Sequence, residues 1–291
     1  MRLTIFTPTY NRRELLTRTY NSLCKQNSKD FEWLIVDDGS TDNTGDLVKK
    51  WIEDKIIDIK YYYKANGGKM RAHNMGVKLA NAPLFLCVDS DDYLIETAVC
   101  DLLEVYDLCK GKTKDGKKVA GVVAHKGADS NKLLGTSDFP EGELSTLYDL
   151  YLRGFAGETT LMYETDMLRQ FMFPEIDGEK YVPEDYIYDK IDSVCVLAIL
   201  PKIITICEIV EAGYTDSVPR LKRENPRAWY LYYEQRARIT PMSMLRIKYL
   251  GRYIIYAIRT KTPIWSNKEI DFVSKIIGFI MAALLKIIRK E

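Results

Sequence analysis

Residues 84–94, LFLCVDSDDYL, place an apolar run directly before three carboxylates, Asp89, Asp91 and Asp92. Residues 84–88 show no alternation of polar and apolar side chains, which predicts a central strand covered on both faces. The acids follow at the point where such a strand would leave its sheet, and ligands of open α/β sheets bind at that carboxyl end. We therefore expect a functional site at residues 89–92.

Two interpretations fit this acidic stretch. Crowded carboxylates raise one another's pKa unless a cation or hydrogen-bond donors compensate. Hard divalent cations prefer oxygen ligands, so the first interpretation is an Mg²⁺ or Mn²⁺ site that carries a diphosphate. The second is an acid-rich turn in which Asp91 or Asp92 caps a helix that starts near Glu96. Only the stretches upstream favour the metal.

Strands and helices alternate through the first ninety residues. Apolar runs predict strands over residues 3–7, 31–36, 56–63 and 84–88, and helical periodicity predicts helices over residues 12–25, 42–55 and 70–80. This order is typical of a parallel sheet with right-handed crossovers. No strand is followed by GxGxxG, and GxxxxGK[ST] is absent, so a dinucleotide dehydrogenase or a P-loop enzyme is poorly supported.

A polar loop follows each predicted strand: PTYN at 8–11, DDGS at 37–40, NGGK at 66–69 and DSDD at 89–92. Each loop alone is an ordinary turn, because turns favour Gly, Asp and Asn. In a parallel sheet, however, all four emerge at one edge. Together they could bind a nucleotide base and ribose with carboxylates, approach a phosphate with glycine backbone and Lys69, and hold a metal.

The stretches PTYNR, VDDGSTD, NGGKMRAHN and DSDD, in this order and spacing over residues 1–95, resemble the inverting family 2 glycosyltransferases. The resemblance is looser from there to about residue 220. It implies an α/β protein with the GT-A fold, in which a nucleotide-binding half merges with an acceptor half in one mixed central sheet. It also implies a nucleotide-diphosphate sugar as donor, most readily a UDP-sugar.

By that resemblance, Pro8, Thr9 and Tyr10 line the base and Asp38 binds its edge. Asp89 and Asp91 are the ribose and metal carboxylates of a DxD motif that holds Mn²⁺ or Mg²⁺. One departure is His73, where many relatives carry Arg. The expected donor-binding residues are Pro8, Thr9, Tyr10, Asn11, Asp38, Gly67, Gly68, Lys69, Asn74, Asp89, Ser90 and Asp91.

The candidate catalytic base lies in Glu184-Asp185, which matches the family's ED motif, in which the Asp is the base. Glu184 is a rival, because Pro183 suits a helix start and would leave both acids in the first turn. Helix capping is the alternative for both. Residues 159–163 and 203–210 predict further strands, residues 165–170 a short helix, and residues 211–217 a loop that could cover the sugar or the acceptor.

We expect a catalytic domain at 1–219, with a nucleotide-sugar half at 1–95 and an acceptor half at 96–219, and a helical extension at 220–291 broken at Pro241. The implied reaction moves a sugar to a hydroxyl of a saccharide or lipid-linked saccharide with inversion, as in bacterial capsule, exopolysaccharide or lipopolysaccharide synthesis. The alternatives are a sugar nucleotidyltransferase, for which PTYNRR lacks the glycines, and a non-catalytic scaffold.

The charge of the chain is polarised. Residues 220–291 hold 16 Lys and Arg against 5 Asp and Glu, whereas the upstream chain holds 26 against 36. Such a tail favours an anionic partner. Its apolar stretch 276–285, IIGFIMAALL, is about half the ~20 residues that a spanning helix needs. We therefore expect residues 267–291 to lie on a membrane surface through Lys275, Lys286, Arg289 and Lys290 rather than bind nucleic acid; a core helix or a dimer seam is the alternative.

The six cysteines form no CxxC pair, which is typical of reduced thiols in a cytosolic protein. The N-terminus reads as a strand, with no signal peptide. The expected location is the cytoplasm, at the inner face of the cell membrane.

Overall fold

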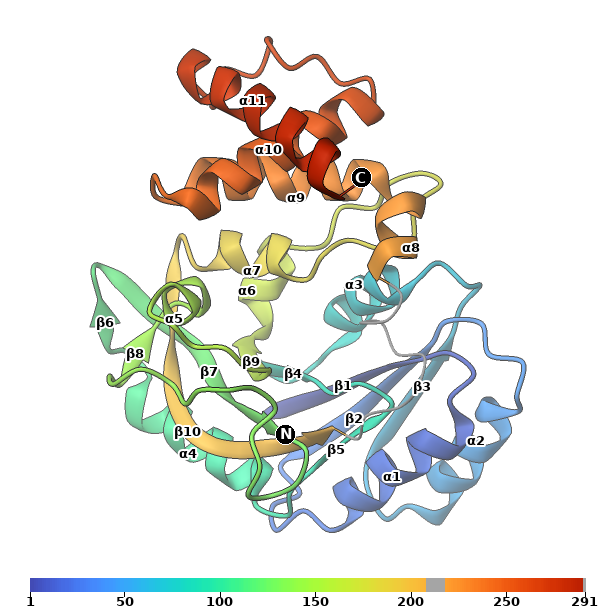
Figure 1. Cartoon of the computed structure of the whole chain (residues 1–291). Coiled ribbons are helices and arrows are strands. Elements are labelled where there is room, and N and C mark those ends of the chain that lie inside the picture. The colour runs from blue at the N-terminus through green and yellow to red at the C-terminus, as the bar shows by residue number, and fades with distance from the viewer. Residues whose placement is uncertain (208–217, 290–291) are drawn as a thin grey trace. The chain divides into compact units, whose positions relative to one another are not determined.

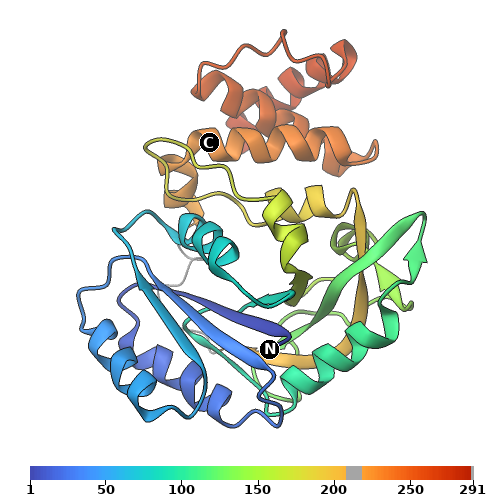
Figure 2. The same cartoon turned by 180° about the vertical axis from the view of Figure 1, so that it is seen from behind.

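The computed structural model describes residues 1–207 and 218–289, and the chain forms two compact units. The first, the sheet unit, comprises Met1–Phe173 and Ile187–Glu211, and the second, the helical unit, comprises Pro174–Tyr186 and Ala212–Glu291. Figures 1 and 2 show strands covered by helices in the sheet unit. The helical unit consists mostly of helices and contains no labelled strand. The segment 174–186 therefore groups with the C-terminal helices.

Four parallel strands form the first half of the sheet, in the order β3-β2-β1-β4. The strands are β1 (Leu3–Thr9), β2 (Phe31–Asp37), β3 (Ile59–Tyr63) and β4 (Leu84–Cys87), and the helices between them are α1 (Arg13–Cys24), α2 (Thr44–Asp54) and α3 (Lys69–Leu79). All seven residues of β1 and of β2 are buried, as expected for strands covered on both faces. The predicted alternation is confirmed, with ends displaced by a few residues.

The second half makes the sheet mixed. β9 (Thr159–Glu164) is antiparallel to β4 and to β7 (Lys117–Gly127), and β7 is parallel to β10 (Cys195–Cys207). The shorter strands are β5 (Asp92–Leu94), β6 (Thr113–Lys114) and β8 (Leu144–Ser145), and the helices are α4 (Ala98–Cys109), α5 (Leu147–Leu152), α6 (Thr165–Gln170) and α7 (Asp185–Ile191).

Two expectations for this half need correction. The strand expected at 203–210 begins at Cys195, because its apolar pattern extends upstream, and residues 208–217, with the expected loop, lie outside the described residues. The helix expected near Glu96 begins at Ala98 after Thr97, while Asp92 opens β5. Asp91 and Asp92 therefore do not cap a helix.

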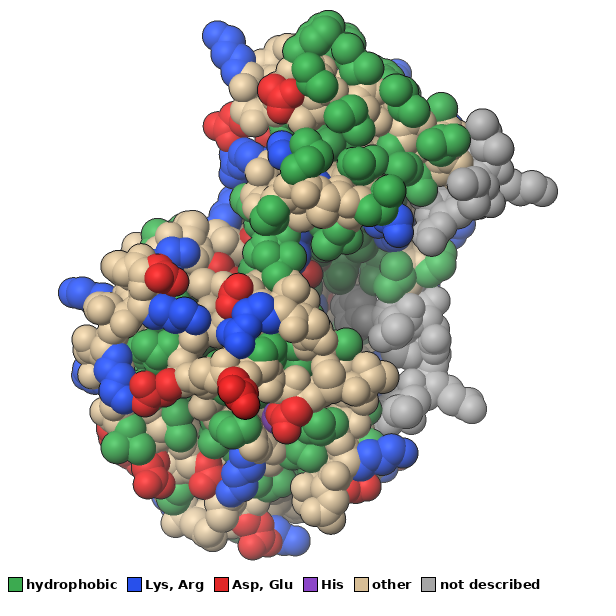
Figure 3. Space-filling view, turned by 60° about the vertical axis from the view of Figure 1, so that its left-hand side comes forward, with side chains coloured by type: hydrophobic (Ala, Val, Ile, Leu, Met, Phe, Trp, Pro, Cys, Tyr) green, Lys and Arg blue, Asp and Glu red, His purple; other side chains and the backbone are tan. Residues whose placement is uncertain are grey.

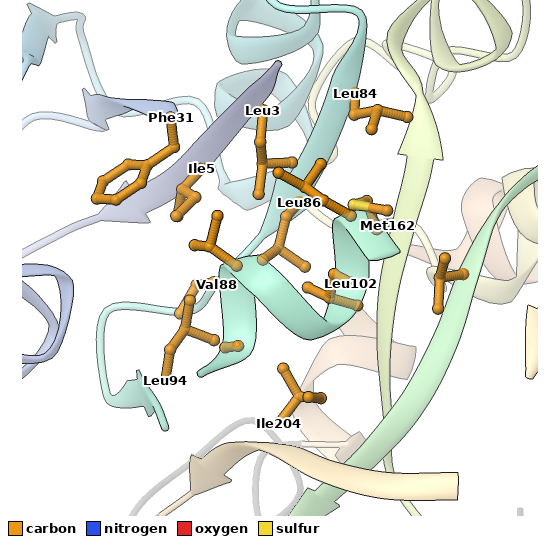
Figure 4. Close-up of a cluster of buried hydrophobic side chains, with 14 of the residues drawn as sticks. Leu3, Ile5, Phe31, Leu84, Leu86, Val88, Leu94, Leu102, Met162 and Ile204 are labelled. Atoms are coloured by element: carbon orange, nitrogen blue, oxygen red, sulfur yellow. The ribbon is translucent and has the colours of Figure 1, made fainter. Parts of the chain in front are cut away.

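One apolar cluster joins the two halves of the sheet. Figure 4 shows Leu3 and Ile5 of β1 beside Leu86 of β4, with Leu102 of α4 and Met162 of β9 completing the group. Burying a side chain of this size contributes roughly 1.5–3 kcal/mol. Because the cluster contains residues from both halves, the two halves share one hydrophobic core. This core holds the strands, and with them their carboxyl ends, in place.

The helical unit is built from α8 (Val218–Glu224), α9 (Pro226–Ile239), α10 (Met244–Arg259) and α11 (Phe272–Arg289). The expected break at Pro241 separates α9 from α10, where the Ser243 hydroxyl accepts a hydrogen bond from Arg246 N. Trp229, Tyr233 and Tyr253 are buried in this unit's core. These three rings therefore pack the helices of this unit against one another.

Candidate active site

The polar loops that follow β1, β2 and β3 meet at one edge of the sheet, as predicted. Asn11 N donates to Ser40 Oγ at 2.9 Å, and Thr41 N donates to Asn11 Oδ1 at 2.8 Å. Asn11 has a φ of 51°, a left-handed conformation that Asn tolerates better than most residues. The loop after β1 is thus fixed against the loop after β2.

Asp38 gathers the NGG loop around itself. Its buried carboxylate accepts hydrogen bonds from Gly67 N at 2.9 Å and from Gly68 N at 2.7 Å, and pairs with Lys64 Nζ. Asn66 Nδ2 adds a bond of 3.1 Å. The sequence suggested that Asp38 binds the base and that the glycine N–H groups approach a phosphate. In this structure these groups bind one another instead.

Two of the three acids after β4 pair with lysines. Lys69 Nζ lies 2.7 Å from Asp89 Oδ1, and Lys126 Nζ lies 2.7 Å from Asp92 Oδ2 and 4.0 Å from Asp89 Oδ2. Burial would raise the pKa of Asp89, but the positive charges of Lys69 and Lys126 lower it to about 2. Asp89 is therefore a carboxylate at any physiological pH.

The sequence analysis included Asp92 in the acidic stretch but missed Lys126 as a site residue. Burial raises the pKa of Asp92, and Asp89 adds to that effect, while Lys126 opposes it. Lys126 comes from the end of β7, more than thirty residues beyond the acids. The available signal was the position of Lys126 just past the apolar stretch at residues 119–124, which is typical of a strand.

Asp91 is the uncommitted acid of the site. Its side chain is partly exposed, and within residues 1–207 and 218–289 no group forms a hydrogen bond or ion pair with its carboxylate. The same part of the chain contains no group of three or more His, Cys, Asp or Glu side chains arranged for a metal. Mg²⁺ is commonly held by one or two carboxylates together with waters and substrate phosphates. The donor set fits such an ion, with Asp91 available and Asp89 shared with Lys69.

The residues expected around the base differ in exposure. Tyr10 has an exposed ring, whereas Pro8, Thr9 and Ser90 are buried. The Thr9 hydroxyl is buried and has no hydrogen-bond partner in the described part of the chain. The Tyr10 ring is therefore accessible for stacking on a base, and the Thr9 hydroxyl is available for a hydrogen bond.

His73 and Asn74 belong to the fold. The His73 ring packs edge-on against Phe6, Phe85 and Phe173 at centroid distances of 5.2–5.7 Å. Asn74 Nδ2 donates to Phe173 O, and Phe173 N donates to Asn74 Oδ1, both at 2.9 Å. The Asn74 amide is thus bonded at both ends to the Phe173 backbone, and its role in donor binding stays a prediction.

The two candidate bases lie in the helical unit. α7 begins at Asp185, so Glu184 directly precedes it. The Asp185 side chain is 47 % exposed, and its Oδ2 lies 2.9 Å from Arg236 Nη2. Burial raises the pKa of Asp185, and Glu184 adds to the rise, while Arg236 and Tyr232 lower the pKa. Asp185 is thus a partly accessible carboxylate with a raised pKa, a shift in the direction that favours a general base.

Replacing Asp38 distinguishes its two roles. We expect Asp38→Asn to lower the free energy of unfolding by about 1–3 kcal/mol, because an amide cannot accept the bonds from Gly67, Gly68 and Lys64 together. Urea unfolding measures this, with the exposed Asp46→Asn as the control. An unchanged urea midpoint combined with lost nucleotide affinity would instead support direct contact with the base.

Parts of the chain are similar in sequence to known proteins. Residues 4–110 match the family model described as glycosyl transferase family 2. The poly(ribitol-phosphate) beta-N-acetylglucosaminyltransferase TarS of Staphylococcus aureus is 33% identical over 109 residues, which cover 37% of this chain and 19% of TarS. Validoxylamine A glucosyltransferase of Streptomyces hygroscopicus subsp. jinggangensis is 42% identical over 92 residues, 30% of this chain and 21% of that protein. The matched region spans about a fifth of each relative.

Solved structures match over nearly the whole chain. The crystal structure of S. aureus TarS 1-349 in complex with UDP-GlcNAc has a TM-score of 0.65 at 21% identity, covering 98% of this chain and 81% of that one. The mannosyltransferase PcManGT from Pyrobaculum calidifontis, in complex with GDP-Man and Mn²⁺, has a TM-score of 0.58 at 16% identity, covering 99% and 81%. The chain therefore has the GT-A fold, and its residues 4–110 match the model of glycosyl transferase family 2.

Proposed function

We propose that this protein is an inverting glycosyltransferase that moves a sugar from a UDP-sugar to a hydroxyl of a saccharide or lipid-linked saccharide. The observation that carries the proposal is the site after β4, where Asp89 pairs with Lys69 and Lys126 and the Asp91 carboxylate, two residues further on, has no partner among the described residues. The family match over residues 4–110 supports it, as does the UDP-GlcNAc bound to the structurally similar TarS.

The roles of the donor site follow from charge and position. Tyr10 stacks on the base, while Lys69 and Lys126 attract the negative charge of the diphosphate. A Mg²⁺ or Mn²⁺ ion held by Asp91 and Asp89 would supply the Lewis acid that stabilises the departing diphosphate. The Mn²⁺ in the similar mannosyltransferase structure supports this assignment.

Asp185 is the general base in this proposal. Its carboxylate takes the proton of the acceptor hydroxyl as the oxygen attacks the anomeric carbon, and attack opposite the leaving diphosphate inverts the configuration. Its raised pKa supports the role, because a carboxylate with a higher pKa accepts a proton more readily. Glu184 remains the rival.

We assign the reaction to the assembly of a bacterial surface polysaccharide such as capsule, exopolysaccharide or lipopolysaccharide. The relatives support a surface glycan: besides TarS, they include the teichoic acid poly(glycerol phosphate) polymerase of Staphylococcus epidermidis, 32% identical over 111 residues. Those residues cover 38% of this chain and 15% of that protein.

We also propose that α11 binds the surface of an anionic membrane. No described helix is long and apolar enough to cross a bilayer. One face of α11 packs on α10, where Gly278 lies against Ile254, and the other face exposes Phe272, Ile276 and Ile280. Figure 3 shows hydrophobic side chains gathered on the C-terminal helices. The net positive charge of residues 220–291 would add roughly 1 kcal/mol per basic residue near an anionic surface.

The structure changes which charges can take part. Lys275 is buried and donates to Asn267 O, so it is not the headgroup contact that the sequence suggested. Lys286 is exposed, and the side chains of Arg289 and Lys290 lie outside the described residues.

The metal assignment predicts the behaviour of Asp91→Asn. We expect loss of sugar transfer and of the Mn²⁺-dependent part of UDP affinity, with the melting temperature within a few degrees of wild type, because a loop acid is not part of the core. Calorimetric titration of UDP with and without Mn²⁺ measures this, with the exposed Glu96→Gln as the control. Near-wild-type turnover of Asp91→Asn in EDTA-treated buffer would refute the metal role. If the wild-type protein binds no UDP with or without Mn²⁺, a non-catalytic scaffold is favoured.

The base assignment predicts that Asp185→Asn lowers turnover by ~10²-fold or more with donor affinity nearly unchanged, the usual scale of general-base catalysis. The neighbouring Glu184→Gln is the matched variant. If Glu184→Gln is inactive and Asp185→Asn is active, the base is Glu184. NMR of the product checks the stereochemistry, and retention at the anomeric carbon would exclude both residues as the base of a single inverting step.

The membrane assignment predicts that wild-type protein sediments with phosphatidylglycerol liposomes and that Phe272→Gln/Ile276→Gln/Ile280→Gln does not, while both hydrolyse the donor. Point changes test α11 better than a deletion of residues 267–291 would. A deletion would expose Leu250 and Ile254, which α11 covers. The control changes three exposed apolar residues of the sheet unit, Tyr63, Leu108 and Val194, to Gln. Equal sedimentation of both triple variants would contradict the proposal; a wild-type dimer that the α11 variant dissociates would indicate a seam between copies.

A further inference from the structure

The segment that carries Glu184 and Asp185 is built onto the start of α9. The Glu179 carboxylate accepts hydrogen bonds from Arg227 N and Ala228 N, both at 2.8 Å. These N–H groups belong to the first turn of α9 and have no partner within the helix. The segment therefore begins at a fixed point on this helix.

Two further contacts hold the segment along α9. Asn225, which directly precedes the helix, accepts hydrogen bonds through Oδ1 from Lys180 N at 2.8 Å and Tyr181 N at 3.0 Å. Near the other end, Gln235 Nε2 donates to Tyr186 O at 3.0 Å. The backbone on either side of Asp185 is thus tied to residues that lie more than forty positions later in the chain.

Asp185 itself is held through one oxygen. Arg236 Nη2 lies 2.9 Å from Asp185 Oδ2, and the Tyr232 hydroxyl donates to the same oxygen at 3.5 Å. In the parts of the chain that the structure describes, no group forms a hydrogen bond with Oδ1. One oxygen is anchored, and the other is left for a ligand.

The two partners of this ion pair differ in burial. The Arg236 side chain is 8 % exposed, against 47 % for Asp185. The guanidinium also lies 5.4 Å from the centre of the Tyr232 ring, a distance typical of a cation–π contact. Arg236 is therefore held in place within the helical unit, while the carboxylate it binds reaches solvent.

We propose that Arg236 is a positioning residue for the catalytic base: it holds Asp185 by Oδ2, turns Oδ1 toward the acceptor hydroxyl and keeps the carboxylate ionised. The inference rests on the proposed role of Asp185 and extends the catalytic machinery to α9, outside residues 4–110 that match the family model.

The charges around Asp185 predict the direction in which its pKa changes when Arg236 is replaced. Burial and Glu184 raise the pKa of Asp185, whereas Arg236 and Tyr232, both on α9, lower it. When Arg236 is removed, only Tyr232 opposes the effects of burial and Glu184, so the pKa of Asp185 rises further. A base must be ionised to act, so the acid limb of the pH–rate profile moves to higher pH.

The test compares Arg236→Gln and Arg236→Lys with Arg238→Gln. Arg238 lies two residues further along α9 and pairs with Glu269, so its loss removes an ion pair away from the base. Turnover and donor KM are measured across the acid and neutral range, and ¹³C NMR follows the Asp185 carboxyl, which is identified by its absence from Asp185→Asn.

For Arg236→Gln we expect the acid limb and the NMR-derived pKa of Asp185 to rise by ~1 unit or more, the scale of an Asp–Arg contact. Turnover falls by ~10-fold or more below the new pKa, and donor KM stays unchanged. Arg236→Lys recovers part of both effects because the charge is kept, and Arg238→Gln behaves as wild type.

An unchanged pKa and an unmoved acid limb in Arg236→Gln would overturn the inference even if turnover fell, since a purely structural role predicts that combination. If Arg236→Gln does not fold, Arg236→Met keeps the buried stem without a buried amide, and the same shifts decide the question. Full turnover of Asp185→Asn would refute the proposed base and, with it, the catalytic part of the inference. The NMR pKa would still report whether Arg236 holds this carboxylate ionised.

Discussion

The arrangement depends on the complete burial of the two central strands β1 and β2. A polar group on a strand covered on both faces needs a partner within the protein, as Glu32 of β2 has in Lys60 and Thr4. Polar side chains that are open to a ligand therefore belong where the strands end. Since β1, β2 and β4 are parallel, their carboxyl ends coincide, and the polar loops meet there.

That convergence brings carboxylates together, and the sheet unit compensates each of the buried ones. Asp38 is matched by Lys64 and by backbone N–H groups, and Asp92 by Lys126. Asp91, at the rim, is left without such a partner among the described residues. Asp38 and Asp92 thus stabilise the loops through their partners, whereas the Asp91 carboxylate is available to bind a cation.

The sequence predicted the parts of the structure that depend on local pattern. The strands before each polar loop, and the meeting of those loops, follow from apolar runs and from parallel topology. Asn74 and Lys275 could not be assigned this way, because their partners, Phe173 and Asn267, are set by tertiary packing. Lys126 and Arg236 were missed for a related reason: each reaches its carboxylate from an element distant in the chain, and no local spacing encodes that contact.

The ion pair between Lys126 and Asp92 also determines where this protein can be recombined with its relatives. Asp92 follows β4, whereas Lys126 belongs to β7, in the half of the sheet assigned to the acceptor. A chimera joined after residue 95 would bring its own residue to the Lys126 position, and loss of one partner of a buried ion pair costs about 3–5 kcal/mol. A donor half transplanted between such enzymes must therefore carry β7 with it, or be joined only to a β7 that places a cation at its end.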